Sequence, residues 1–427
     1  MEKVQNLIEF IHQSPTPYHA TEAIANRLEK EGFTKLAENK PWDLKSGGSY
    51  YVVRDQSSVI CFKIGLKSDF RGYRIVASHS DTPGFKLKPN GIAENANYRK
   101  LNTEVYGGPI FSTWTDRPLG LAGRVFRKTK EGLISEFVNI PDDCLIPNLP
   151  IHFNREVNKG IELNAQVDMQ AVLGVKNGSE KITLNELLKK DDLVSHDLFL
   201  YNGEKGKVLA SEDIFVSPRI DNLECAFATL EGFLQAKNDT DILVYACFNN
   251  EEIGSATKQG AGSTFLKDVL ERIGFAFGKS WEAQKIALAN SVIVSADNAH
   301  AIHPNRPEKF DFLNYAKLNE GIVIKHSARQ SYTSDAFSVA LFQAACDKAR
   351  VPYQAFANRS DERGGGTLGA ISSSQVSITS VDIGLAQLAM HSALESAGTQ
   401  DVIYMIEAIR SFMEMDYSLD QPNLLIE

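Results

Sequence analysis

The sequence predicts an α/β fold in two parts: a discontinuous α/β domain and a mostly β domain inserted into it. Short apolar, β-branched runs alternate with helix-period segments towards both ends of the chain. Between them, over residues 91–214, short strand-like runs are punctuated by glycine, and no amphipathic helix is expected before Thr183–Lys190. Candidate site residues flank this stretch on both sides. We therefore expect 1–90 and 215–427 to fold together.

Composition describes a globular protein that is too long for one ordinary core. The chain has 427 residues, of which 43% are hydrophobic and 23% are charged. Its net charge of −9 argues against nucleic acid as a general partner, because phosphate binding needs a basic surface. Neither an export signal nor a membrane-spanning run is visible. The sequence therefore predicts a cytoplasmic protein that binds no membrane.

The five cysteines are scattered, odd in number and never arranged as Cys-x-x-Cys. This spacing argues against a disulfide framework and against a zinc site made of thiolates. We expect reduced cysteines that serve packing.

In the first part of the chain, Ser14–Pro17 is expected to break the helical pattern, and Arg74–Ser78 is a strand that ends at His79. The remaining predicted elements up to residue 140 are helices over Val4–His12 and Ala20–Glu31, and strands over Tyr50–Val53, Ser58–Ile64, Leu121–Arg127 and Leu133–Ile140.

After the inserted region the α/β rhythm resumes. Helices are predicted over Leu223–Gln235, Thr264–Ile273, Ala336–Ala349 and Asp401–Met413, and strands over Ile242–Phe248, Ser291–Ala296, Glu320–Lys325 and Ser377–Val381. The glycine-rich loop Ser360–Gly369 lacks a following Lys-Ser/Thr and is a weak match to a phosphate-binding loop.

Potential metal ligands follow several of these strands. His79 ends one strand, Glu251 and Glu252 follow Ile242–Phe248, and Asp297 follows Ser291–Ala296. Parallel strands of one sheet bring such ends together, however far apart they lie in the chain. Two further candidates, Asp221 and His391, lie in turn-like contexts.

This set of side chains predicts a metal site that carries chemistry. Histidine nitrogen and carboxylate oxygen without sulfur suit zinc, cobalt or manganese in an open catalytic site. Five ligands are more than one tetrahedral ion needs, so two ions bridged by a carboxylate fit better. The Glu251-Glu252 pair could divide two roles, one carboxylate holding metal while the other handles a proton.

Each residue also has an ordinary structural interpretation. His79 could cap a buried strand, Asp221 could be a helix N-cap, and Asp297 could be a turn residue. His391 could be a packed helix histidine, and the two glutamates could be the acidic first turn of a helix. Each ordinary interpretation is reasonable for one residue. For all of them to be correct at residues that the sheet brings together would be a much larger coincidence.

Seven stretches, in this order along the chain, resemble the aspartyl aminopeptidase family of dinuclear zinc metallopeptidases. They are SPTPYHA (14–20), SHSDTPGFKLKP (78–89), SPRIDNLECAF (217–227), FNNEEIGSATKQGAGS (248–263), SADNAHAIHPN (295–305), RQSYTSDAF (329–337) and LAQLAMHSALESAG (385–398). The resemblance covers nearly the whole chain. It implies a zinc-aminopeptidase-like α/β/α sandwich as catalytic domain, with the inserted domain serving dimerisation and acting as a lid.

The resemblance also implies an activity and a division of roles. The chain would hydrolyse the N-terminal residue, preferably Asp or Glu, from peptides. The implied roles are His79 and Asp297 on one ion, Glu252 and His391 on the other, Asp221 bridging both, Glu251 as general base and Asp81 supporting the histidine ligand. Zinc is the implied metal, with cobalt or manganese as alternatives.

Two implied positions concern the substrate. Lys325 falls on the lysine that pairs with the acidic side chain of the first residue, although it could instead be a solvent-exposed lysine at a strand end. His152 falls on a histidine that reaches a neighbouring subunit's site, in dimers that assemble into a tetrahedral dodecamer. Arg363 departs from the family, whose members often have proline or a small residue there. This departure bears on specificity more than on reaction type.

Two classes of alternative remain. A related dinuclear metallohydrolase could act on neutral N-terminal residues or on acylated amino acids, and rates on Asp, Glu, Leu and N-acyl substrates would separate these. A non-catalytic assembly or binding homologue would be marked by loss of a ligand or of the base, and the sequence retains all of them.

Overall fold

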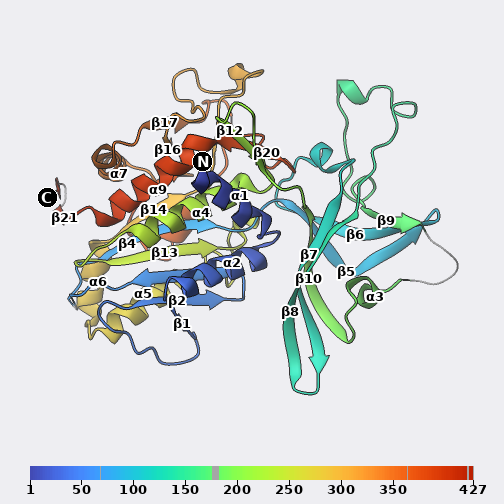
Figure 1. Cartoon of the computed structure of the whole chain (residues 1–427). Helices are drawn as coiled ribbons and strands as arrows, with labels where there is room; N and C mark the ends of the chain where they lie inside the picture. Colours follow the sequence, from blue (N-terminus) through green and yellow to red (C-terminus); the bar gives the residue numbers. More distant parts are fainter. Residues whose placement is uncertain (68, 176–181, 363, 421–422, 427) are drawn as a thin grey trace.

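Two large β-sheets lie side by side, each formed by a different part of the chain (Figure 1). The structure is a computed structural model that describes residues 1–67, 69–175, 182–362, 364–420 and 423–426. The first sheet has the order β1-β2-β3-β13-β4-β14-β18-β16-β17. Its strands are β1 Thr34–Leu36, β2 Ser49–Arg54, β3 Ser58–Lys63, β4 Tyr73–His79, β13 Ile242–Phe248, β14 Val292–Ala296, β16 Ile322–His326, β17 Tyr353–Ala357 and β18 Thr379–Gly384.

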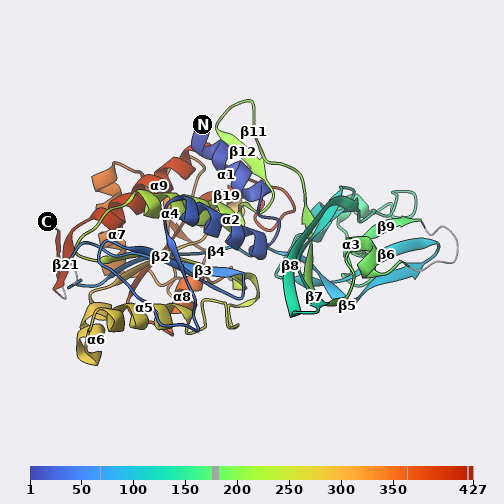
Figure 2. The same ribbon diagram turned by 60° about the horizontal axis from the view of Figure 1, so that its bottom comes forward.

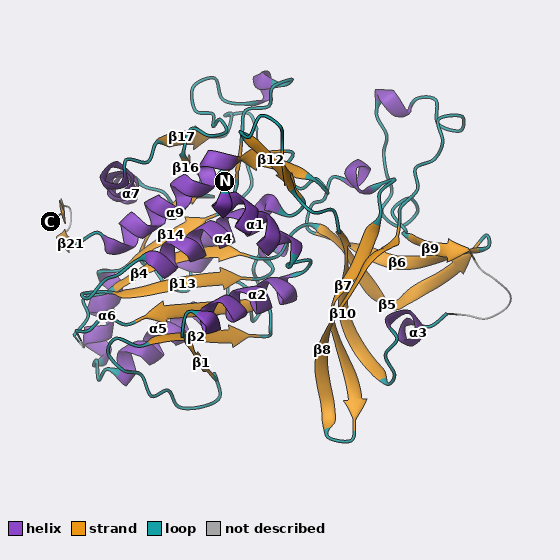
Figure 3. Cartoon of the chain, in the orientation of Figure 1, coloured by secondary structure: helices purple, strands orange, loops and turns teal. Residues whose placement is uncertain are grey.

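The second sheet is made wholly from the middle of the chain and has the order β8-β7-β10-β5-β6-β9. Its strands are β5 Gly84–Asn95, β6 Tyr98–Tyr106, β7 Leu119–Thr129, β8 Gly132–Cys144, β9 Val172–Val175 and β10 Leu193–Asn202. Figure 3 shows these strands as a unit beside the helix-covered first sheet. Two small sheets complete the described strands: β11 Lys207–Val208, β12 Ile214–Ser217, β15 Ala299–His300, β19 Ala386–Leu388 and β20 Glu395–Gly398 in one, and β21 Tyr417–Asp420 and β22 Asn423–Ile426 in the other.

Helices cover both faces of the first sheet (Figure 2). On one face α1, α2, α4, α7 and α9 pack in one apolar core, and on the other α5, α6 and α8 pack in a second. The described helices are α1 Glu2–His12, α2 Pro17–Lys30, α3 Leu184–Leu188, α4 Ile220–Gln235, α5 Phe265–Ala276, α6 Trp281–Ala289, α7 Ala336–Ala349, α8 Leu368–Ser373 and α9 Thr399–Glu414, with short 3₁₀ turns η1 Phe111–Trp114, η2 Val157–Lys159, η3 Glu251–Ile253 and η4 Pro307–Lys309. The predicted α/β/α sandwich is confirmed.

Strand β13 shows how the sequence specifies these layers. All seven of its residues are buried. Leu243, Tyr245 and Cys247 belong to the core under α4, whereas the alternating residues Ile242, Val244, Ala246 and Phe248 belong to the core under α5. Because successive side chains of a strand point to opposite faces, a continuous apolar run is what a strand covered on both sides requires.

Several predicted boundaries agree with the structure and others do not. Strand 242–248 and helix 336–349 are confirmed at both ends. Helix α2 begins at Pro17 and not at Ala20, because proline is tolerated at the first helical position and so opens this helix. The helix Trp281–Ala289 was not predicted, because only Gln284 and Ala287 are buried on it and no apolar stripe results.

The extent of the inserted domain, 91–214, stays a prediction, although the second sheet already begins at Gly84. The five cysteines are all free and buried, as expected. Among the described residues, no helix combines the length and the apolar character needed to cross a membrane.

Candidate metal centre

The site forms at the carboxyl edge of the first sheet. Strand β4 lies between β13 and β14 and runs parallel to both. His79 is the last residue of β4, and Asp297 follows β14 directly. Glu251 and Glu252 lie in the turn η3 just after β13. The predicted convergence of strand ends therefore occurs because neighbouring parallel strands end at the same edge.

Two groups of potential ligands overlap at Asp221. His79 Nε2 lies 3.4 Å from Asp297 Oδ1 and 3.7 Å from Asp221 Oδ1. His391 Nε2 lies 3.4 Å from Asp221 Oδ2 and 3.5 Å from Glu252 Oε2. The candidate ligand atoms within each group lie within 4.8 Å of one another. The two oxygens of one carboxylate thus face two different histidines.

The residues present fit divalent cations. Asp221 Oδ1 and Glu252 Oε1 are buried and, within the described part of the chain, have no hydrogen-bond partner. Buried carboxylate oxygens normally accept hydrogen bonds or bind a cation. With imidazole nitrogens as the other donors and no thiolate among them, the set suits zinc, cobalt or manganese.

Asp81 organises the surroundings of His79. Its carboxylate is fully buried and accepts the backbone N–H of Glu251 at 3.1 Å and that of Glu252 at 3.2 Å. His79 Nδ1 lies 3.1 Å from the main-chain oxygen of Asp81 and 3.5 Å from its carboxylate. The nearest partner of the ring is therefore the carbonyl, while the carboxylate holds the two glutamates.

Residues outside the predicted set hold the other histidine. Glu395 accepts the backbone N–H of Asp221 at 3.0 Å and that of His391 at 2.7 Å. His391 Nδ1 lies 3.0 Å from the main-chain oxygen of Gly108, which belongs to the segment after β6. Glu395 lies within one of the recognised stretches, whereas only the Gly107-Gly108-Pro109 turn marks the other contact in the sequence.

The cluster contains more buried carboxylates than cationic side chains, and this affects their pKa values. Burial raises the pKa of Glu251 to about 8. Burial, followed by repulsion from Asp221, raises the pKa of Glu252 well above its usual range. Burial also acts to raise the pKa of Asp297, but Lys325 and His79 outweigh it and lower that pKa to about 2. Divalent cations would neutralise this excess of negative charge.

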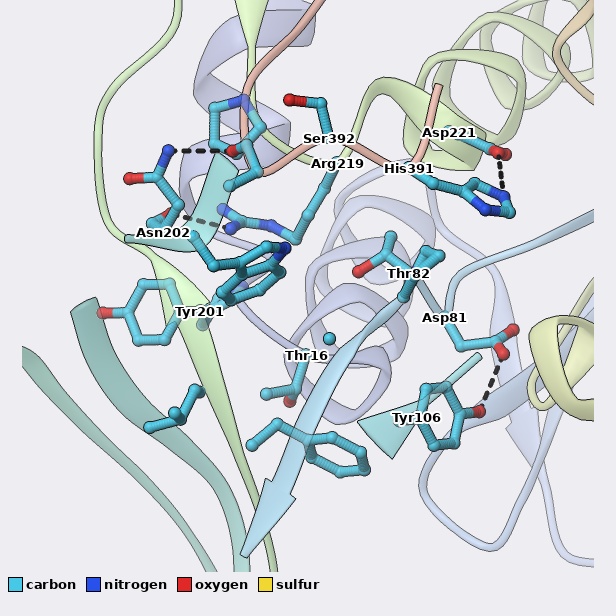
Figure 4. A pocket seen from close by; sticks show the side chains of 18 of the residues that line it. Thr16, Asp81, Thr82, Tyr106, Tyr201, Asn202, Arg219, Asp221, His391 and Ser392 are labelled. Carbon is cyan, nitrogen blue, oxygen red and sulfur yellow. Dashed lines mark hydrogen bonds and ion pairs between the residues drawn. The ribbon is translucent and has the colours of Figure 1, made fainter. Parts of the chain in front are cut away.

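A pocket adjoins the cluster between the two sheets. Asp81, Asp221 and His391 line it together with Tyr106 and Arg219 (Figure 4). The guanidinium of Arg219 donates to the main-chain oxygens of Asn202 and Ile11, so it joins the second sheet to helix α1 beside the site. The pocket is thus shaped by both parts of the chain.

The two predicted substrate residues differ in placement. Lys325 is 3% exposed, which rules out the solvent-exposed alternative; its Nζ lies 3.7 Å from Asp297 Oδ2 and donates to Asn298 O at 2.8 Å. His152 is exposed, in the segment between β8 and β9 that projects away from the first sheet (Figure 1), and the structure does not bring it to the cluster. Arg363 lies outside the described residues.

Comparison with known proteins agrees with this geometry. The model of the aminopeptidase I zinc metalloprotease family (M18) matches residues 10–413. A probable M18 family aminopeptidase 2 of Clostridium novyi (strain NT) is 46% identical, with 96% of this chain and 98% of the relative covered. A chain in the cryo-EM structure of the Ape4 and Nbr1 complex is 33% identical, with a TM-score of 0.93 and coverage of 96% of this chain and 85% of that one.

A third match is the structure of the S. cerevisiae mApe1 dodecamer, which is 28% identical, with a TM-score of 0.81 and coverage of 96% and 95%. An α/β/α sandwich with histidines and carboxylates gathered at one sheet edge is the framework of a metallopeptidase. The chain belongs to the M18 family of zinc metalloproteases. It is a metalloaminopeptidase, and the family resemblance seen in the sequence is confirmed.

Proposed function

We propose that this enzyme uses two metal ions and removes an N-terminal Asp or Glu from peptides. The observation that carries the proposal is the pair of ligand groups that share Asp221, with a buried lysine beside them. His79 and Asp297 would hold one ion, Glu252 and His391 the other, and Asp221 both. Bound there, two zinc ions, or cobalt or manganese, supply the Lewis acidity that makes water a nucleophile at neutral pH.

In this proposal Glu251 carries the proton. Its Oε2 lies 4.0 Å from His79 Nε2, beside the ligand groups, and its backbone is held by Asp81. The carboxylate accepts a proton from the water that attacks the first peptide carbonyl. It then gives that proton to the amine nitrogen as the C–N bond breaks.

Lys325 supplies the preference for an acidic first residue. An ammonium group has three N–H donors. The contacts with Asn298 O and Asp297 account for two of them, and the Tyr332 ring, with its centroid 5.5 Å from Nζ, is a weak partner that leaves the third available to a substrate carboxylate. A neutral first residue would leave this buried donor without a partner, and that cost discriminates against it.

The experiment compares Asp-, Glu-, Leu- and N-acyl-aminoacyl chromogens with the purified, metal-loaded enzyme and its Lys325→Met variant. Methionine keeps the unbranched stem and removes the charge. We expect kcat/KM for Asp to fall about 10- to 100-fold, since a hydrogen bond to a charged group contributes about 1.5–3 kcal/mol, while the value for Leu changes little.

An unchanged ratio of Asp to Leu rates would contradict the role of Lys325. Hydrolysis of the N-acyl substrates alone would favour the amidase alternative. No hydrolysis of any substrate by the metal-loaded protein would favour a non-catalytic homologue. The matched control is Lys317→Met, which makes the same change at an exposed lysine elsewhere in the chain.

We further propose that the inserted domain forms dimers and that these assemble into a tetrahedral dodecamer in the cytoplasm. Support comes from the mApe1 dodecamer and from apolar side chains exposed around His152: Leu149 is 58% exposed, Ile151 52% and Phe153 80%. In such an assembly His152 would reach a neighbouring subunit's site. The mass in solution tests this, and a monomer would contradict it; cell fractionation tests the compartment.

A further inference from the structure

The segment that follows β6 brings the second sheet into contact with the metal centre. After Tyr106 the chain passes Glu252 so closely that a Cβ at Gly107 would lie 3.1 Å from the Cβ of that glutamate. It then meets His391 twice: Gly108 O lies 3.0 Å from Nδ1, and the N–H of Ile110 donates to the main-chain oxygen at 2.9 Å. The segment that leaves the second sheet therefore touches two of the candidate ligands.

Tyr106, the last residue of β6, adds a side-chain contact. Its hydroxyl donates to Asp81 Oδ2 at 2.8 Å, as Figure 4 shows, and accepts from Asn250 Nδ2 at 2.8 Å. Asn250 precedes the Glu251-Glu252 turn, and Asp81 accepts the backbone N–H groups of both glutamates. One hydroxyl thus links the residue before this turn to the carboxylate that holds it.

The ring of Tyr106 is held in place by the second sheet. Tyr106 is 8% exposed, and its ring meets that of Phe199 on β10 edge-on, with centroids 5.4 Å apart and planes at 86°. The strand itself pairs with β5 at this end, Tyr106 opposite Gly84. The position of the hydroxyl is consequently determined by the inserted sheet and not by the sheet that carries the candidate ligands.

Loss of this hydroxyl would disturb both of its partners. A hydrogen bond from a hydroxyl to a buried carboxylate is charge-assisted and strong. Without it, Asp81 Oδ2 would keep the N–H of Glu252 alone, and the Asn250 amide would lose an acceptor. The apolar cores would be unchanged, because the aromatic ring at position 106 would still pack against Phe199.

We propose that Tyr106 is a positioning residue for the proposed reaction, on which this inference rests. From the inserted sheet it orients Asp81 and the Glu251-Glu252 turn, and so it couples the placement of that sheet to the geometry of the base and of one ligand. It contacts neither substrate nor metal in this role, and acts through Asp81 and Asn250.

The test compares Tyr106→Phe with Tyr98→Phe, the same change at the other end of the same strand, where the side chain is 48% exposed. We expect Tyr106→Phe to lower zinc affinity, measured by chelator competition, or kcat on the best substrate, by about 10- to 100-fold, the usual effect of removing a group that orients metal ligands. KM and the far-UV circular dichroism should change little. Equal zinc affinity and equal kcat in the two variants would overturn the proposal.

A double-mutant cycle separates positioning from a general structural effect. Asn250 has φ +65°, so glycine replaces it without backbone strain. The amide oxygen of Asn250 also accepts from Thr257 and Gln259, and the cycle cancels that loss because it occurs in both variants that carry Asn250→Gly. Because both groups act through one hydroxyl, the combined Tyr106→Phe and Asn250→Gly variant should lose less zinc affinity than the product of the separate losses. A loss of zinc affinity equal to the product of the two separate losses would show that Tyr106 and Asn250 act independently, and would overturn this part of the proposal. Because zinc competition needs no substrate, the cycle can be interpreted even if the proposed peptidase activity is not found.

Discussion

The two halves of the metal centre are built in different ways. His79 and Asp297 end neighbouring parallel strands, and their side chains are 1% and 11% exposed. His391 lies in the loop between β19 and β20 at φ +68°, and its side chain is 31% exposed. The register of a sheet positions the first half. The second half takes Glu252 from the turn after β13, but its histidine depends on loops and on contacts with another sheet.

The partners of the two histidines show the same contrast. His79 is held by the main-chain oxygen of Asp81, two residues later in the segment that leaves β4. His391 is held by Glu395 and by Gly108, which come from β20 and from the segment after β6. Asp221 joins the halves, with one oxygen near each histidine. The two histidines, one buried at a strand end and one partly exposed in a loop, can therefore respond differently to change.

The largest effect is expected from Glu251→Gln. This variant tests whether the base can be removed while both ligand groups still bind metal. The amide keeps the shape of the side chain but cannot accept the proton. We expect kcat to fall about 10²- to 10⁴-fold, the usual contribution of a general base, with the metal content unchanged. Steady-state kinetics with metal analysis checks this. Full activity would reject the assignment, and loss of metal would make Glu251 a ligand.

A comparison of His79→Ala with His391→Ala tests whether the two halves of the metal centre differ. On the proposed ligand assignment each variant should bind one ion instead of two, because each removes the histidine of one ion. In metal-free protein, His79→Ala should lower the free energy of unfolding by about 2–4 kcal/mol, since a buried ring leaves a cavity and strips partners from Asp81 and Asp297.

His391→Ala should lower the free energy of unfolding by less, about 1 kcal/mol, because a partly exposed side chain leaves a smaller cavity. Denaturant titration of metal-free protein measures both values, with His12→Ala at the exposed end of α1 as control. Equal losses would show that the two halves do not differ in how the fold supports them.

The same difference decides how far the sequence could predict the site. The run Ile242–Phe248 is apolar throughout and stops at two asparagines, so its bounds and its burial on both faces could be predicted. Because parallel strands share one carboxyl edge, the convergence of His79, Glu251 and Asp297 followed from three strand ends.

The contacts between the second sheet and the metal centre could not be predicted in this way. No periodicity indicates that Tyr106 of the second sheet meets Asp81, or that Gly108 meets His391, because these contacts depend on how two sheets pack and not on local pattern. His391 was a candidate ligand in a turn-like context, and its role was assigned by family resemblance, since the placement of a loop residue at positive φ follows from neither helical nor strand spacing.

The position of β4 in the sheet bears on how the protein is made. β4 leaves the ribosome before either of its neighbours, β13 and β14, has been translated, and the whole six-stranded sheet is synthesised in between. The nascent chain thus carries an apolar segment whose two neighbouring strands have not yet been made, the condition in which partly made proteins aggregate and in which chaperones act. The ligand group around His79 and Asp297 is complete once Asp297 has been made, whereas the group that contains His391 has to wait for that residue, which comes after most of the polypeptide has been synthesised.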